Sequence, residues 1–74
     1  MTLDQLRPGS SGLIWKICLD DLLGRRLLTM GIYPGLRVRV VRNAPLRDPM
    51  EVEIEGNFFS LRRAEVRLIE VLGE

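Results

Sequence analysis

Hydrophobic and charged residues alternate along most of two segments near the middle of the chain. Residues 36–42 (LRVRVVR) place Leu36, Val38 and Val40 on one face, and residues 50–55 (MEVEIE) alternate apolar residues with glutamates in the same way. This period of two predicts two strands that each have one buried face. If the strands pair antiparallel, their arginines face their glutamates on the outer surface, where each cross-strand pair contributes about 0.2–1 kcal/mol.

Two further segments predict strands from a less regular pattern. Residues 12–19 (GLIWKICL) form an apolar run of strand length that contains β-branched residues. Because the alternation is imperfect, it does not decide which of Ile14, Trp15 and Ile17 point inward. A bulge in this strand is one option. Residues 66–72 (VRLIEVL) are expected to form the last strand.

A fifth strand is expected after a tight hairpin. Gly56-Asn57 is a two-residue turn signal that follows the glutamate-rich segment. In the resulting register Phe59 and Leu61 face the core, whereas Phe58 lies on the outer face. Residues 61–65 (LRRAE) then form a short turn of 3₁₀ type.

Between the first two strands the spacing changes to that of a short helix. Asp20 and Asp21 offer an N-cap and place negative charge at the helix start. The apolar residues Leu23, Leu27 and Met30 recur at helical spacing and would form one buried stripe.

Glycine and proline residues are expected to weaken the start of this helix and to end it. Gly24 weakens its first turn by roughly 1 kcal/mol relative to alanine, so the firm part is expected to begin near Arg25. Gly31 is placed to adopt the left-handed conformation that ends a helix, and Pro34 blocks continuation. Pro34 and Gly35 then turn the chain into the next strand.

These elements predict a mainly β fold: a small, partly open β-barrel of about five strands with one short helix after the first strand. With 74 residues, the chain forms a single domain, residues 1–74, with a thin core. Leu3 and Leu6 are expected to cover one end of that core.

Composition narrows the function classes. The chain contains no histidine and a single cysteine, so an intrachain disulfide and the commonest general base are both excluded. There is no phosphate-cradling glycine loop with lysine. We therefore expect a non-enzymatic protein. No apolar run reaches the length of a membrane span and no signal peptide is recognisable, so we expect a cytoplasmic protein that is not embedded in a membrane.

Four segments in order resemble the ferrous iron transport protein A (FeoA) family: LRPGSSG, then LLTMGIYPG at 27–35, APLRDP at 44–49, and LRRAE at 61–65. The resemblance covers essentially the full chain. It implies an SH3-like barrel and an accessory role in ferrous iron uptake, through contact with a FeoB-type membrane transporter that carries a cytosolic GTP-binding part. The signature residues are Leu27, Met30, Gly31, Pro34, Gly35, Ala44, Pro45, Asp48 and Pro49.

The candidate partner-binding residues come from the helix and from the 43–49 loop. Leu22 lies beside two arginines off the apolar stripe, and the loop follows the second predicted strand. Arg47 places a large cation where members of the FeoA family often have glycine. The candidates are Leu22, Arg25, Arg26, Leu46 and Arg47.

A metal-responsive module is the first alternative. Cys18, Asp20 and Asp21 are close in sequence, and Asp48 and Glu51 form a second pair, although neither set has a recognised ligand spacing. No cofactor is required by this interpretation, and the sites would hold Fe²⁺ or Zn²⁺ weakly or adventitiously.

A nucleic-acid-binding barrel is the second alternative. The chain has several arginines, but its net charge is only +1 and aromatic residues make up 5%. Interleaved glutamates argue against a groove that follows phosphates, so no nucleic acid partner is expected. A homodimer stays open, because small barrels carry open strand edges.

Overall fold

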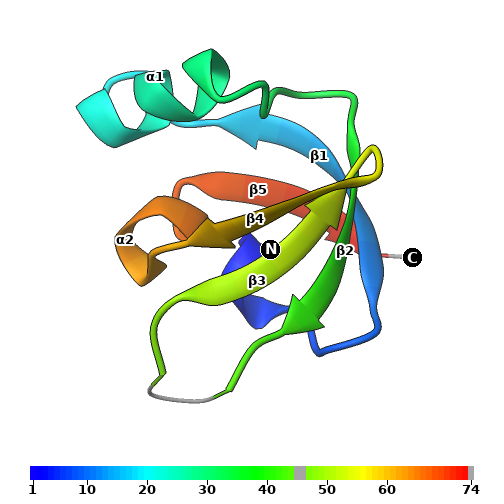
Figure 1. Cartoon of the computed structure of the whole chain (residues 1–74). Coiled ribbons are helices and arrows are strands. Elements are labelled where there is room, and N and C mark those ends of the chain that lie inside the picture. Colours follow the sequence, from blue (N-terminus) through cyan, green and yellow to red (C-terminus); the bar gives the residue numbers. More distant parts are fainter. Residues whose placement is uncertain (45–46, 74) are drawn as a thin grey trace.

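The chain folds into one curved antiparallel sheet with short helices at its margins (Figure 1). The computed structural model describes residues 1–44 and 47–73. The strands lie in the spatial order β4-β3-β2-β1-β5. In chain order the elements are η1 (Leu3–Gln5), β1 (Ser11–Ile17), α1 (Leu22–Thr29), β2 (Arg37–Arg42), β3 (Met50–Ile54), β4 (Asn57–Leu61), α2 (Arg63–Val66) and β5 (Ile69–Gly73). The predicted mainly β architecture, with a helix after the first strand, is confirmed.

The core is a single apolar cluster inside the curve of the sheet. The alternating residues of β2 and β3 point into it as predicted, and Leu3 and Leu6 close one end. Leu36, Met30 and Phe59 are partly buried and pack against this cluster. Its buried members are Leu3, Leu6, Ile14, Ile17, Leu27, Ile32, Val38, Val40, Met50, Val52, Ile54, Leu61, Val66, Ile69 and Val71.

The outer face of β2 and β3 carries the predicted pairing of Arg39 with Glu53, and a bulge adds a second ion pair that the alternation did not predict. Arg39 lies opposite Glu53, and its Nη2 is 2.8 Å from the Glu53 Oε1. Arg42 Nη1 lies 3.9 Å from Glu51 Oε1 after a register shift at Val41. Because these side chains are partly exposed, each pair contributes at most about 1 kcal/mol.

Strand β1 is shorter than predicted and contains a bulge. It ends at Ile17, so the residues up to Leu19 lie outside the strand. Its pairing with β5 shifts between Ile14 and Lys16. The shift lets Ile14 and Ile17 both point inward, while Trp15 remains 47% exposed.

The hairpin between β3 and β4 turns one residue earlier than predicted. Ile54 pairs with Asn57, so the two turn residues are Glu55 and Gly56. Both have positive φ, 52° and 82°, as a type I′ turn requires. The predicted faces of β4 are nevertheless confirmed, because Leu61 is buried and Phe58 is 69% exposed.

The last strand begins later than predicted. Val66 belongs to α2, and β5 starts at Ile69. The amide of Val66 donates to the carbonyl of Arg62 at 3.0 Å, which closes one turn of α-helix in place of the expected 3₁₀ turn. Val66 is fully buried, so its side chain packs in the core although the residue belongs to a helix and not to a strand.

Helix α1 begins at Leu22, directly after the predicted N-cap residue Asp21, although its firm part was expected only from about Arg25. The carboxylate of Asp21 caps it by accepting a hydrogen bond from the Leu23 amide at 2.8 Å. Gly24 is buried, and a Cβ placed there would lie 1.7 Å from the carbonyl oxygen of Cys18. Glycine is therefore required here, because it lets the helix lie directly on the end of the first strand.

The helix ends in a Schellman motif. Gly31 has a φ of 90°, its amide donates to Leu28, and the amide of Ile32 donates to Leu27. Leu27 and Ile32 are both fully buried, which supplies the hydrophobic contact of this motif. The predicted left-handed Gly31 is confirmed, as is the turn through Gly35, whose φ is 101°.

Replacing Gly24 by alanine tests this contact. Alanine favours an exposed helix by about 1 kcal/mol over glycine. Here we expect Gly24→Ala to lower the free energy of unfolding by about 1–3 kcal/mol or more, because the new methyl group meets backbone. Urea denaturation measures the change. Arg26→Ala, exposed on the same helix, is the control and should change stability by less than about 0.5 kcal/mol. A Gly24→Ala protein as stable as the parent would contradict the assignment.

Candidate partner-binding surface

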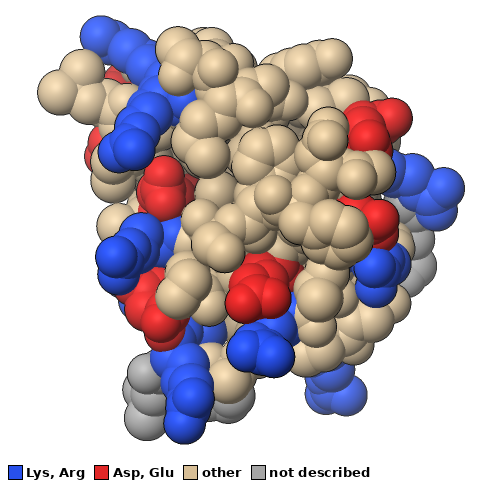
Figure 2. Space-filling model, viewed as in Figure 1, with Lys and Arg blue, Asp and Glu red and all other residues tan. Residues whose placement is uncertain are grey.

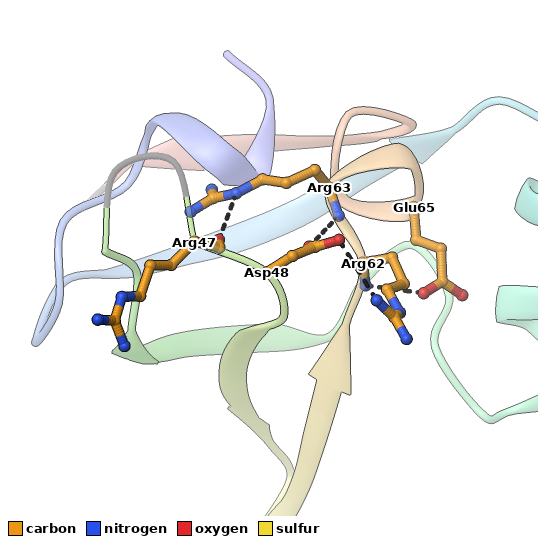
Figure 3. Close-up of polar contacts among 5 residues, drawn as sticks. All are labelled: Arg47, Asp48, Arg62, Arg63 and Glu65. Atoms are coloured by element: carbon orange, nitrogen blue, oxygen red, sulfur yellow. Dashed lines mark hydrogen bonds and ion pairs between the residues drawn. The ribbon is translucent and has the colours of Figure 1, made fainter.

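The side chain of Arg63 binds the backbone of the 43–49 loop at two residues, Ala44 and Arg47 (Figure 3). The guanidinium of Arg63 donates through Nη2 to the carbonyl of Ala44 at 2.7 Å and through Nε to the carbonyl of Arg47 at 3.1 Å. These two carbonyls belong to the described residues before and after positions 45–46, so Arg63 fixes the backbone at both of them. Because the bonds start from a charged group, each is stronger than a neutral one.

Asp48 adds a third contact by capping α2, and the contacts of Arg63 and Asp48 together are called the clasp below. Its Oδ1 accepts a hydrogen bond from the Arg63 amide at 2.8 Å, and its Oδ2 lies 3.6 Å from Arg62 Nη1. Glu65 is only 8% exposed, and its Oε1 accepts from the Arg62 amide at 2.8 Å. The free amides at the start of α2 are thus bound by two carboxylates, one local and one from the loop.

The clasp leaves the side chain of Arg47 on the outside. Figure 3 shows it extending away from Arg63 and Asp48, and the residue is exposed. Leu46, the other loop candidate, and Pro45 lie outside the described residues. The loop therefore presents a cation from a backbone held at its two ends, which is an arrangement suited to recognition.

The outer face of α1 forms the second part of the candidate surface. Leu22 is 76% exposed, and Arg26 is exposed on the next turn. Arg25 has a structural bond in addition, because its Nε donates to the carbonyl of Leu19 at 2.8 Å. In the view of Figure 2, basic side chains project at the upper left, where Figure 1 places α1. The face thus joins an exposed leucine to positive charge.

Around the rest of the face in Figure 2, acidic and basic side chains lie next to one another and surround a region of uncharged residues. The ion pairs of Arg39 with Glu53 and of Arg42 with Glu51 are examples of such neighbouring opposite charges. Neighbouring opposite charges weaken the field that attracts phosphates over a distance. None of the helices in the described ranges has the length and hydrophobicity needed to cross a lipid bilayer.

The acidic metal candidates are mostly engaged by other groups. Asp21 caps α1, Asp48 caps α2, and Glu51 pairs with Arg42. Among residues 1–44 and 47–73, no group of three or more histidine, cysteine, aspartate or glutamate side chains could hold a metal ion.

Cys18 and Asp20 lie elsewhere, in a shared surface groove. That groove is also lined by Glu70 and by the cations Lys16 and Arg67, whose positive charges offset its carboxylates and weaken the attraction for a bound cation. Asp21, the third member of this predicted set, does not line the groove and caps α1 instead.

Two residues with a role in this surface were missed by the sequence analysis. Arg63 was expected in a turn and as one arginine of the nucleic-acid alternative, and Asn43 was expected only as the first residue of the loop. The Asn43 Nδ2 donates to the carbonyls of Asp4 and Leu6 at 2.9 and 2.7 Å, tying the start of the loop to the N-terminal segment. The ordered spacing of APLRDP and LRRAE was the available signal, because it joins two segments that are paired in space.

Removing the Asp48 carboxylate tests the clasp. We expect Asp48→Ala to lower the free energy of unfolding by about 0.5–2 kcal/mol, the usual effect of losing a helix cap. Hydrogen exchange of the Arg63 amide should accelerate, because that amide loses its acceptor. Asp48→Asn is the matched variant, since it keeps an oxygen acceptor and should retain most of the protection. Equal exchange at Arg63 in all three proteins would contradict the cap.

Comparisons of this chain with a family model and with known proteins point to the same family. The FeoA domain model matches residues 1–72. A curated "Fe(2+) transport protein A/Fe(2+) transporter FeoB fusion protein" from Porphyromonas gingivalis is 37% identical over 71 residues, which cover 96% of this chain. The chain spans only 8% of that relative's length.

Two solved structures extend the comparison. Iron(II) transport protein A from Clostridium thermocellum is 36% identical with a TM-score of 0.87, and the match covers 99% of this chain and 45% of that one. FeoA from Stenotrophomonas maltophilia, a prokaryotic SH3 domain protein solved with zinc, is 29% identical with a TM-score of 0.84 and coverages of 97% and 89%. The expected SH3-like fold is confirmed. This chain therefore belongs to the FeoA domain family, which is implicated in ferrous iron transport.

Proposed function

We propose that this protein is a non-enzymatic, cytoplasmic accessory protein of ferrous iron uptake that binds the cytosolic part of a FeoB-type transporter. The observation that carries the proposal is the Porphyromonas gingivalis fusion, in which a segment 37% identical to nearly all of this chain is joined to FeoB. Fusion holds two modules at a high effective concentration, which favours a contact that is weak between separate proteins.

The contact proposed is the outer face of α1 together with the 43–49 loop. Leu22 is the most exposed large hydrophobic residue among those described, and it lies beside Arg26. Burying a leucine side chain fully in an interface contributes about 1.5–3 kcal/mol. Arg47 adds a cation on a loop whose backbone Arg63 already holds, so little ordering cost accompanies its use.

Direct binding to the transporter tests this function. The purified chain is titrated against the FeoB-type transporter of the same genome in nanodiscs, with and without a GTP analogue and Fe²⁺. We expect saturable binding that weakens roughly tenfold in Leu22→Ala and in Arg47→Gly, a change of about 1.4 kcal/mol each. Both variants should unfold at the parent's urea concentration, because both side chains are exposed.

Leu72→Ala is the matched control, because Leu72 is also an exposed leucine but lies on β5. It should bind as the parent does. Absence of binding under every nucleotide and metal condition would remove the partner proposal, and equal weakening by all three substitutions would remove the proposed surface.

A metal-responsive module is the second candidate, because the FeoA relative from Stenotrophomonas maltophilia was solved with zinc. In this chain the engaged carboxylates and the cations beside Cys18 favour weak binding only. Anaerobic calorimetry with Fe²⁺, Mn²⁺ and Zn²⁺ should give no stoichiometric plateau. A one-to-one plateau that is lost in Cys18→Ser or in Asp48→Asn would instead establish a metal site and place this candidate first.

A further inference from the structure

The two edges of the sheet differ in how they are finished. At β5 the N-terminal residues cover the edge: the amide of Val71 donates to the carbonyl of Met1 at 2.8 Å, and Thr2 bridges Glu70. At the other edge lies β4, and within the described residues no strand pairs with its far side. The protein thus carries one covered edge and one open edge.

The register shows which backbone groups the open edge presents. The amide of Val40 donates to the carbonyl of Ser10, on the β1 side of β2. Alternation of an antiparallel ladder then sets the direction of every residue in the next strands. By this alternation Phe59 turns its N–H and C=O toward β3, whereas Phe58 and Ser60 turn theirs away from the sheet. Both Phe58 and Ser60 are exposed.

The open edge also lacks the usual protection against pairing. Natural edge strands carry charges, proline or a bulge that prevents contact with another strand. Strand β4 (NFFSL) contains none of these residues, and its pairing with β3 runs without a register shift. In addition, Phe58 is 69% exposed on this strand. A large apolar ring next to unpaired backbone groups is a surface that favours another strand.

We propose that β4 pairs antiparallel with β4 of a second copy of this chain, with a two-fold axis beside Phe59. In this register Phe58 of one protomer lies opposite Ser60 of its partner, and each such pair exchanges two backbone hydrogen bonds. The register uses the outward-facing groups of both residues in both protomers. It joins the two sheets into one continuous sheet across the interface.

The charges that flank β4 support a second copy as the occupant. Glu55 precedes the strand and Arg62 follows it, and both are exposed. In this register Glu55 of one protomer lies opposite Arg63 of its partner and next to Arg62 in the same basic pair, and the two-fold axis repeats the contact at the other end. The segment is therefore complementary in charge to its own reversed copy.

The side chains fit the same register. On the outer face the small Ser60 lies opposite the partner's Phe58, which leaves room for the ring. The two Phe58 rings are then diagonal neighbours, a separation of roughly 7–8 Å that aromatic side chains span. Pairing therefore buries the most exposed aromatic residue among those described together with the backbone groups beside it. This inference is independent of the transporter proposal, since it uses neither α1 nor the loop tip.

Sedimentation equilibrium over a wide concentration range tests the dimer. We expect the average mass to rise with concentration from 8.5 kDa toward twice that value. Phe58→Lys places a charge on the edge and should abolish the rise. Leu22→Lys is the matched control, an exposed apolar residue on α1, and should associate as the parent does. Thermal unfolding of both variants checks that the barrel is intact.

A charge exchange tests the register. Glu55→Arg and Arg62→Glu should each weaken association by roughly tenfold, and the double variant should restore it. A constant mass of 8.5 kDa up to millimolar protein would overturn the proposal. So would a dimer that survives Phe58→Lys and is lost in Leu22→Lys, which would locate the interface on α1. Failure of the double variant to recover would overturn the two-fold register.

Discussion

The close contact between α1 and the end of β1 is the constraint on which this small barrel depends. Gly24 lies against the carbonyl of Cys18, where no side chain fits. That contact lets a helix of only eight residues cover the core with Leu27. The Schellman motif at Gly31 then returns the chain so that Ile32 is buried as well. A domain of this size buries a limited apolar area, so a helix held farther out would leave the core open.

The same principle of holding short segments by specific contacts recurs at the 43–49 loop. Arg63 binds two loop carbonyls, and Asp48 returns a carboxylate to the amide of Arg63. Neither group acts alone, because Asp48 caps α2 while Arg63 of α2 binds the carbonyls of Ala44 and Arg47. The signature segments APLRDP and LRRAE are therefore two halves of one structural unit. The exposed side chain of Arg47 is carried by that unit, which links a packing requirement to the proposed recognition surface.

The two edges of the sheet differ in what covers them. One edge is closed by the first two residues of the chain, and the other ends at β4 with exposed backbone groups. The proposed transporter surface lies on α1 and on the loop, whereas the proposed self-pairing surface lies on β4. Arg62 stands between the two regions, since it pairs with Asp48 and follows β4 directly. The two proposed contacts would therefore use separate surfaces of the chain.

The sequence by itself determined the features that depend on neighbouring residues. The period of two set the buried faces of β2 and β3, glycine and proline set the end of α1, and the ordered motifs indicated the FeoA family before any fold was known. Tertiary structure decided what depends on contacts between distant segments. Gly24, which local propensity counts as a weakness, is required by a neighbouring carbonyl. Asp48, a metal candidate by residue type, is a helix cap because the fold brings α2 to it. Local patterns indicate backbone preference and burial. They do not determine which group from a distant part of the chain lies next to a residue in the fold.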